Sequence, residues 1–119
     1  MRYPERGEVW LIDLGLTAKI RPCLVVSAPI GPTDRALISL VPHTTSTRST
    51  SFEAAVRVRF LKPGAFDAQG LVTVPPVRAV RLLGTLKAAE LAAVEAAICK
   101  WLQLPCGIIN DDETSPRIE

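Results

Sequence analysis

Histidine, acidic clusters and glycine-rich loops are scarce or missing in this sequence, and each absence removes a class of active site. A single histidine, His43, excludes a metal site built from several histidines, and the Asp and Glu residues form no cluster that could replace one. No glycine-rich phosphate-binding loop precedes a helix. We therefore expect neither a metal ion nor a nucleotide cofactor.

Cysteine is also rare, and no targeting signal is visible. The three cysteines, Cys23, Cys99 and Cys106, are odd in number and match no metal-binding spacing. The chain does not open with a cationic segment and an apolar run, as a secretion signal does, and no apolar run approaches the length of a membrane span. We therefore expect a cytoplasmic protein without membrane contact, whose reduced thiols are small buried or incidental side chains.

What the chain does contain fits one small domain with a basic surface. Its 119 residues suffice for a single core, and 48% hydrophobic and 22% charged residues are close to globular averages. Residues 1–104 carry thirteen Lys or Arg against eight Asp or Glu. We expect a single domain over residues 1–104 and a mobile acidic tail over residues 105–119. A basic body fits a nucleic-acid ligand, although many domains that bind no polyanion are equally basic.

Short apolar runs separated by prolines predict a β-rich fold. We expect strands over residues 7–13, 24–27, 36–41, 52–60, 70–74 and 77–82, with loops or turns over residues 16–20, 28–34, 43–51 and 61–66. Residues 87–102 repeat apolar side chains at helical spacing and are rich in alanine, which predicts one helix, capped near Thr85. The expected fold is mainly β, a small and strongly bent sheet or barrel closed by a C-terminal helix.

Two polar residues at the ends of apolar runs form the candidate site. Arg21 precedes one run, and Thr44 follows another that ends at Pro42. A guanidinium stays charged and presents a planar fork of donors, so Arg21 suits electrostatic stabilisation of a phosphate, with proton donation as a lesser role. The Thr44 hydroxyl can hold a phosphate oxygen, and Thr45 and Ser46 can assist.

Metal-free phosphate chemistry points to RNA as the substrate. RNA carries its own nucleophile, the 2′-hydroxyl, so a nuclease needs only to align that hydroxyl and stabilise the phosphoryl oxygens. His43 is a candidate general acid or base because its ordinary pKa lies near neutrality. Five further arginines are solvated charges, some of which can touch an RNA backbone: Arg48, Arg57, Arg59, Arg78 and Arg81.

Ordinary structural explanations stay open for the same residues. An Arg-Pro pair at the start of a strand is common, and two threonines after a proline often form a plain strand end stabilised by local hydroxyl bonds. A lone histidine in a polar loop need not be catalytic, and nothing in the spacing around His43 favours a Ser-His-Asp triad.

Three motifs, taken in order, resemble the MazF/PemK family of type II toxins. They read RGEVWLIDL over residues 6–14, RPCLVVS over residues 21–27 and VPHTT over residues 41–45, and the resemblance runs from about Arg6 to Leu102. It implies a homodimer with the SH3-like barrel of the MazF/CcdB/PemK toxin type. It also implies a metal-independent, sequence-selective endoribonuclease that cleaves single-stranded RNA to a 2′,3′-cyclic phosphate and a 5′-hydroxyl. Arg21 and Thr44 take the positions of the family's catalytic arginine and threonine.

The resemblance further implies a cognate antitoxin whose flexible segment occludes this site. Two features differ from many members: residues 16–20 are short and lack the acidic and glutamine residues, and Pro75 and Pro76 replace an Asp-Gln pair. The means of RNA base recognition is therefore open. Two alternatives also stay open: a non-catalytic toxin of the same fold that acts on DNA gyrase, and a degenerate binding module that retains only the antitoxin contact.

Overall fold

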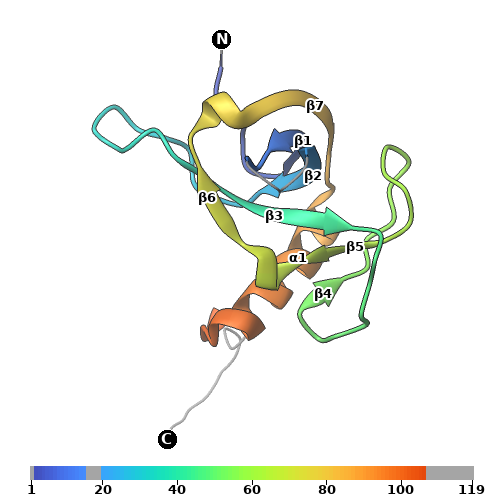
Figure 1. The fold of residues 1–119 in the computed structure, drawn as a ribbon. Coiled ribbons are helices and arrows are strands. Elements are labelled where there is room, and N and C mark those ends of the chain that lie inside the picture. Colours follow the sequence, from blue (N-terminus) through green and yellow to red (C-terminus); the bar gives the residue numbers. More distant parts are fainter. Residues whose placement is uncertain (1, 16–19, 107–119) are drawn as a thin grey trace, which may run out of the picture.

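The computed structural model describes residues 2–15 and 20–106, which form a bent antiparallel sheet and one C-terminal helix (Figure 1). Within these residues the strands are β1 (Glu8–Asp13), β2 (Ile20–Val25), β3 (Ile38–Thr44), β4 (Glu53–Ala54), β5 (Ala65–Asp67), β6 (Val72–Val74) and β7 (Ala79–Thr85). The 3₁₀ turns η1 (Ala68–Gly70) and η2 (Pro76–Arg78) flank β6, and the helix α1 (Ala88–Leu102) follows β7. The expected mainly β fold with a C-terminal helix is confirmed. Most of the predicted first loop and acidic tail lies outside the described residues.

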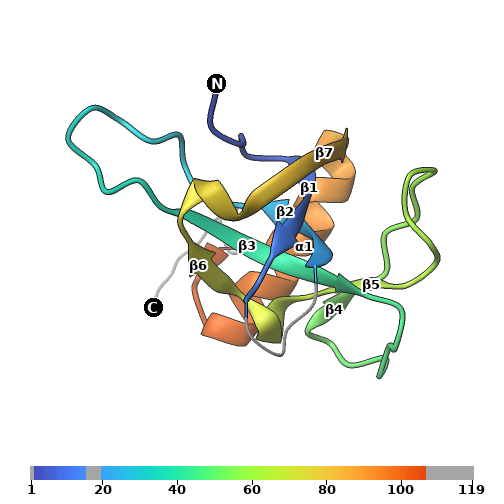
Figure 2. The same cartoon turned by 45° about the horizontal axis from the view of Figure 1, so that its top comes forward.

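Strand β3 takes part in two sets of pairings, and this sharing bends the sheet. The strands lie in the order β4-β5-β3-β2-β1-β7, and β6 pairs with the first half of β3. On that edge residues 38–40 pair with β6, whereas His43 and Thr44 pair with β5. The long β3 therefore passes from one sheet into a second (Figure 2).

Pro42 lies inside β3, although the sequence predicts that the strand ends there. Val26 donates its N–H to the carbonyl oxygen of Ser39 at 2.9 Å, so these two residues form a hydrogen-bonded pair. Hydrogen-bonded and non-hydrogen-bonded pairs alternate along an antiparallel ladder, and Cys23 and Pro42, three positions away, therefore form a non-hydrogen-bonded pair. The missing N–H of Pro42 thus falls on the other edge, between the pairings with β6 and β5. A proline is tolerated there because no ladder bond is lost.

Two hydrophobic clusters cover the two faces of the sheet. Leu24 and Val41, which face each other across β2 and β3, belong to the cluster that packs with Val94 of α1. The next pair, Val25 and Leu40, belongs to the second cluster on the opposite face. Because the central strands are buried on both faces, their sequences read as continuous apolar runs rather than as alternating ones.

Helix α1 confirms the predicted helix over residues 87–102, but its N-terminal cap differs from the prediction. The side chain of Glu90 accepts the N–H of Lys87 at 2.8 Å, which is the glutamate half of a capping box. Thr85, near which the cap was expected, belongs to β7. None of the described helices is both long and apolar enough to cross a bilayer.

The predicted strand over residues 52–60 is wrong for most of its length. Only Glu53 and Ala54 pair, as β4, and the chain then leaves the sheet. Burial still alternates, since Ala54 and Val56 are buried in the helix-side cluster. The period of two therefore reflects packing against the core rather than strand pairing.

Other predicted boundaries shift by a few residues. The last two residues of the turn predicted over residues 61–66 belong to β5. The strands predicted over residues 70–74 and 77–82 begin later, because η1 and η2 occupy their first residues. The strand predicted over residues 24–27 is the end of β2, which begins at Ile20.

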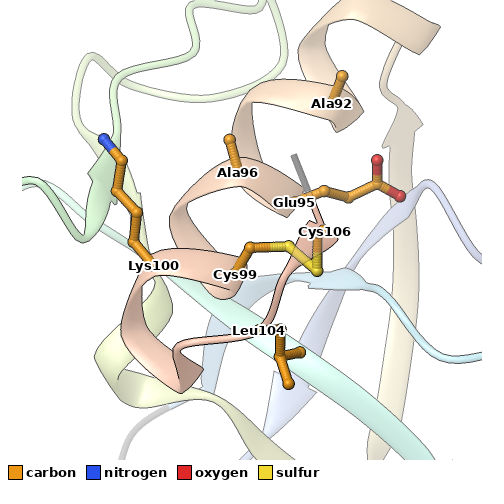
Figure 3. Close-up of a pocket in the computed structure, with 7 residues that line it drawn as sticks. All are labelled: Ala92, Glu95, Ala96, Cys99, Lys100, Leu104 and Cys106. Atoms are coloured by element: carbon orange, nitrogen blue, oxygen red, sulfur yellow. A yellow bond between two sulfur atoms is a disulfide. The ribbon is translucent and has the colours of Figure 1, made fainter. Parts of the chain in front are cut away.

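Cys99 and Cys106 form a disulfide, so the expectation of reduced thiols is wrong for these two residues (Figure 3). The helix ends in a Schellman motif, in which Leu104 donates to the carbonyl of Cys99 and Gln103 donates to that of Lys100. Gln103 adopts the left-handed conformation at φ 54°. This reversal brings Cys106 back over the last turn of α1. Glycine is the usual residue at such a turn, so a glutamine gives little warning of it.

Thiol titration tests this disulfide. Cys23 is buried, which raises the pKa of its thiol to about 12, and it stays unpaired. For protein purified without reductant and then denatured, we expect one titratable thiol per chain, rising to three after reduction. The Cys23→Ser variant should lower both values by one, and three thiols before reduction would contradict the disulfide.

Gly64→Ala should destabilise the fold, because the backbone of residue 64 approaches β3 closely. A Cβ atom there would overlap the carbonyl oxygen of Thr44 and lie 2.8 Å from Cε1 of His43. We expect a loss of about 1–3 kcal/mol in the free energy of unfolding, measured in urea. The control is Gly31→Ala, whose nearest neighbour is the flexible Asp34 carboxylate at 3.0 Å. Equal losses in both variants would rule out this explanation.

Candidate functional site

Arg21 lies near the start of β2, where the sheet opens to solvent. It pairs with Ile12 of β1. Its side chain projects on the same face of β2 as those of Cys23 and Val25, which are buried. Its own side chain is exposed. Strand pairing thus fixes the backbone of Arg21 and leaves its guanidinium accessible to a ligand.

Thr44 is the last residue of β3 and pairs with Ala65 of β5. Its Oγ1 accepts the N–H of Ser46 at 3.0 Å. This bond uses one lone pair of the hydroxyl oxygen and leaves the O–H available as a donor. Thr44 can therefore donate to a phosphate oxygen while its own oxygen is held in place.

Arg21 and Thr44 lie at the same end of two neighbouring strands. The pairing of β2 with β3 ends at Cys23 and Pro42, and Arg21 and Thr44 each lie two positions beyond that pair. Because side chains alternate along a strand, both project on the face of that last pair. We call this place the fork, since β3 there leaves β2 and pairs with β5.

His43 lies on the opposite face of β3 from Thr44. The residue is 4% exposed, and its ring packs edge-on against Phe66 with ring centroids 5.0 Å apart. Its Nε2 has no hydrogen-bond partner among the described residues, and burial lowers the pKa of the ring. The structure therefore separates His43 from Arg21 and Thr44, whereas Thr45 and Ser46 follow Thr44 directly and are exposed.

The five arginines predicted to touch RNA are exposed but come from different elements. Arg48 lies in the loop between β3 and β4, and Arg57 and Arg59 lie in the loop between β4 and β5. Arg78 ends η2, with its guanidinium 4.0 Å from the carboxylate of an aspartate in β1, and Arg81 lies on β7. Of the five, Arg48, Arg57 and Arg59 lie on loops next to β4 and β5, and β5 is the strand that pairs with Thr44. Contact of the five arginines with RNA stays a prediction.

Glu53 is a further candidate that the sequence analysis missed. Its Oε1 and Oε2 accept the N–H of Arg48 at 3.0 and 3.1 Å, and Oε1 also accepts the N–H of Ser49 at 2.8 Å. Ser49 has a left-handed φ of 55°. The signal that could have revealed Glu53 is the preceding run of Ser and Thr, whose backbone N–H groups have no strand partner and need acceptors.

One of the two departures from the resembled family lies at the start of η2, and the other lies outside the described residues. Pro75 is exposed and Pro76 is buried, and together they begin η2. The loop over residues 16–19 lies outside the described residues.

Neither a metal site nor the hollow beside the disulfide involves the predicted site residues within the part of the chain that the structure describes. No group of three or more His, Cys, Asp or Glu side chains within residues 2–15 and 20–106 could hold a metal ion. A hollow of about 410 Å³ lies beside the disulfide, lined by Ala92, Glu95, Ala96, Cys99, Lys100, Leu104 and Cys106 (Figure 3). It lies at the end of α1, which places it in a different part of the fold from Arg21 and Thr44.

The sequence and the fold match one toxin family. A family model described as PemK-like, MazF-like toxin of type II toxin-antitoxin system matches residues 5–102. A solved structure named an endoribonuclease from a mycobacterial species is 26% identical, with a TM-score of 0.74 over 88% of this chain and 96% of that chain.

Two similar structures contain a second protein. One is named an endoribonuclease in complex with its cognate antitoxin from a mycobacterial species; it is 26% identical, with a TM-score of 0.75 over 86% of this chain and 97% of that chain. The other is a MazE–MazF structure from Deinococcus radiodurans, 21% identical, with a TM-score of 0.72 over 86% of this chain and 97% of that chain. At that identity the second shows similarity of fold alone.

Replacing His43 should make stability less dependent on pH. Burial lowers the pKa of His43 from its ordinary value of 6.5, so the unfolded chain binds a proton more readily than the folded protein does. The resulting stability is present above about pH 6.5 and is lost as the pH falls through the lower folded pKa. Between about pH 7.5 and about pH 5.5, urea unfolding should show a larger loss for the wild type than for His43→Leu. Parallel losses in the two proteins would contradict this account.

Proposed function

The chain belongs to the PemK-like, MazF-like toxin family of type II toxin–antitoxin systems, and on this premise we propose that it is an endoribonuclease toxin. The proposed activity is metal-independent, sequence-selective cleavage of single-stranded RNA that leaves a 2′,3′-cyclic phosphate and a 5′-hydroxyl. Two similar mycobacterial structures carry the name endoribonuclease. The observation that carries the proposal is the fork, which brings Arg21 and Thr44 to the same end and face of adjacent strands.

The proposed reaction exchanges one ester bond of the phosphate for another. The 2′-oxygen attacks phosphorus and loses its proton, while the bond from phosphorus to the 5′-oxygen breaks and that oxygen gains a proton. Negative charge grows on the non-bridging oxygens as the transition state forms. The Arg21 guanidinium stays cationic and stabilises this charge, and the Thr44 hydroxyl donates to one oxygen and holds the phosphate in line with the 2′-oxygen.

The neighbours of Thr44 take different roles in this proposal. Thr45 and Ser46 are exposed beside it and can donate hydroxyl bonds to an adjacent phosphate. His43 faces the core on the other side of β3, so we assign it to the stability of β3 and not to proton transfer. The charges of Arg48, Arg57 and Arg59 would attract the RNA backbone on the loops beside β5.

The proposed toxin acts within a pair of proteins. One similar structure is named as a complex with its cognate antitoxin. We propose that a cognate antitoxin binds this chain through a flexible segment that occludes the fork, and that the toxin is a homodimer. An extended segment can do so by covering the exposed guanidinium of Arg21, to which an acidic side chain is complementary.

Loss of either fork residue should abolish most of the cleavage. We expect Arg21→Ala and Thr44→Ala each to lower the cleavage rate by about 100-fold or more, because each removes a group that stabilises the transition state. The measurement is cleavage of a mixed RNA substrate in EDTA, followed by sequencing of the RNA ends. Arg35→Ala, an exposed arginine in the loop between β2 and β3, should retain the wild-type rate.

The same experiment tests the endoribonuclease activity and the assignment of its residues separately. Intact RNA with folded wild-type protein, across diverse sequences, would overturn the endoribonuclease; inhibition of DNA gyrase by that protein would then favour the alternative toxin. Wild-type rates in both fork variants would overturn only the assignment of Arg21 and Thr44. Thermal melts of every variant confirm that the loss is not one of folding.

A further inference from the structure

A hollow lined by both polar and apolar residues lies next to Thr44, on the loop that follows β3. Its volume is about 430 Å³, within the roughly 300–1,000 Å³ of small-ligand sites. Four hydroxyl groups and one carboxylate line it, from Thr45, Thr47, Ser49, Thr50 and Glu53. We call it the hydroxyl hollow. The hydroxyls and the carboxylate can form hydrogen bonds with a ligand, and Ala55, Pro63 and Ala65 of the same hollow supply apolar contact.

Strand register places the carboxylate of the hydroxyl hollow on the same face as Thr44. Thr44 pairs with Ala65, and Asp67, two residues further along β5, pairs with Glu53. Side chains two residues apart share a face, so Thr44 and Glu53 project on the same side of this small sheet. Gly64 also lines the hollow, and its Cα lies close enough to β3 that an added Cβ would contact the Thr44 carbonyl oxygen.

Glu53 is held in a defined orientation rather than left free in solvent. Its Oε1 accepts the N–H groups of Arg48 and Ser49 at 3.0 and 2.8 Å. The adjacent Phe52 packs edge-on against Trp101 of α1, with ring centroids 5.2 Å apart. The ring packing holds the residue next to Glu53 against α1, and the loop bonds fix the carboxylate of Glu53 itself. Its Oε2 takes part only in the longer 3.1 Å contact with Arg48, so it keeps acceptor capacity for a ligand.

Given the proposed function, we propose that the hydroxyl hollow binds the base of a nucleotide next to the cleaved phosphate, and that Glu53 determines which base is accepted. The bases of single-stranded RNA expose their Watson–Crick edges, which proteins read by hydrogen bonding. A carboxylate oxygen accepts from an exocyclic amino group, as when Glu or Asp binds the N4 amino group of cytosine. It repels a carbonyl oxygen at the same position. Glu53 therefore favours cytosine over uracil and adenine over hypoxanthine, pairs of nearly equal size.

Glu53→Gln tests this assignment without removing the loop contacts. The amide oxygen can replace Oε1 as the acceptor for Arg48 and Ser49, while the amide nitrogen replaces Oε2 and turns an acceptor into a donor. We would measure cleavage of short RNAs that carry cytidine or uridine, and adenosine or inosine, at each position flanking the cleaved bond. The wild type should prefer the amino-bearing base by about 10-fold at one such position. Glu53→Gln should remove or invert that preference.

Glu5→Gln is the matched control, since Glu5 is an exposed carboxylate in the segment before β1. It should keep the wild-type rates and preferences. Cleavage by the wild type with no such preference, or with a preference that Glu53→Gln leaves unchanged, would overturn the role of Glu53. No cleavage of any substrate by folded wild type would overturn the proposed function, and this subsite with it. Thermal melts of both variants separate a change of base preference from a loss of fold.

Discussion

The double pairing of β3 is the constraint on which the rest of the structure depends. One edge of β3 pairs first with β6 and then with β5, and the other edge pairs with β2 only as far as Pro42. The departure of β3 from β2 opens the end of β2 and exposes Arg21, while it carries Thr44 forward to the edge of the second sheet. The alternation of side chains along β3 then separates a buried His43 from an accessible Thr44. One strand thus supplies both a core residue and a site residue at adjacent positions.

The close approach of residues 64 and 65 to β3 connects the fork to the loops around it. Gly64 has room for no side chain beside the Thr44 carbonyl, so this part of the second sheet is held at short range. Glu53 of β4 accepts hydrogen bonds from backbone N–H groups of the loop that follows Thr44. The Ser- and Thr-rich loop, which offers no apolar face, is therefore ordered by a carboxylate rather than by burial.

The sequence predicts the elements whose signal lies within one segment, such as the helix. Strand boundaries and the faces that side chains share depend on the pairing between segments. The helix over residues 87–102 was predictable because its apolar period and alanine content act within the segment itself. The sequence predicts a strand end at Pro42, since nothing in it shows that the missing N–H falls between two pairings. Likewise, Arg21 and Thr44 stood out by chemistry and by resemblance, but their common face depends on a register that no single segment contains. Glu53 was missed because its partners are backbone groups of a loop without periodicity.

The turn after α1 gives its two cysteines a high effective concentration. The bonds from Leu104 and Gln103 to the last turn of the helix reverse the chain without help from the disulfide. The two thiols therefore stay neighbours after reduction, and closure of the pair is an intramolecular step that competes well with capture by small thiols. The disulfide, which joins residues seven positions apart, shares a hollow with Val26 and Ser39 and so lies at the opposite end of the β2–β3 pair from Arg21 and Thr44.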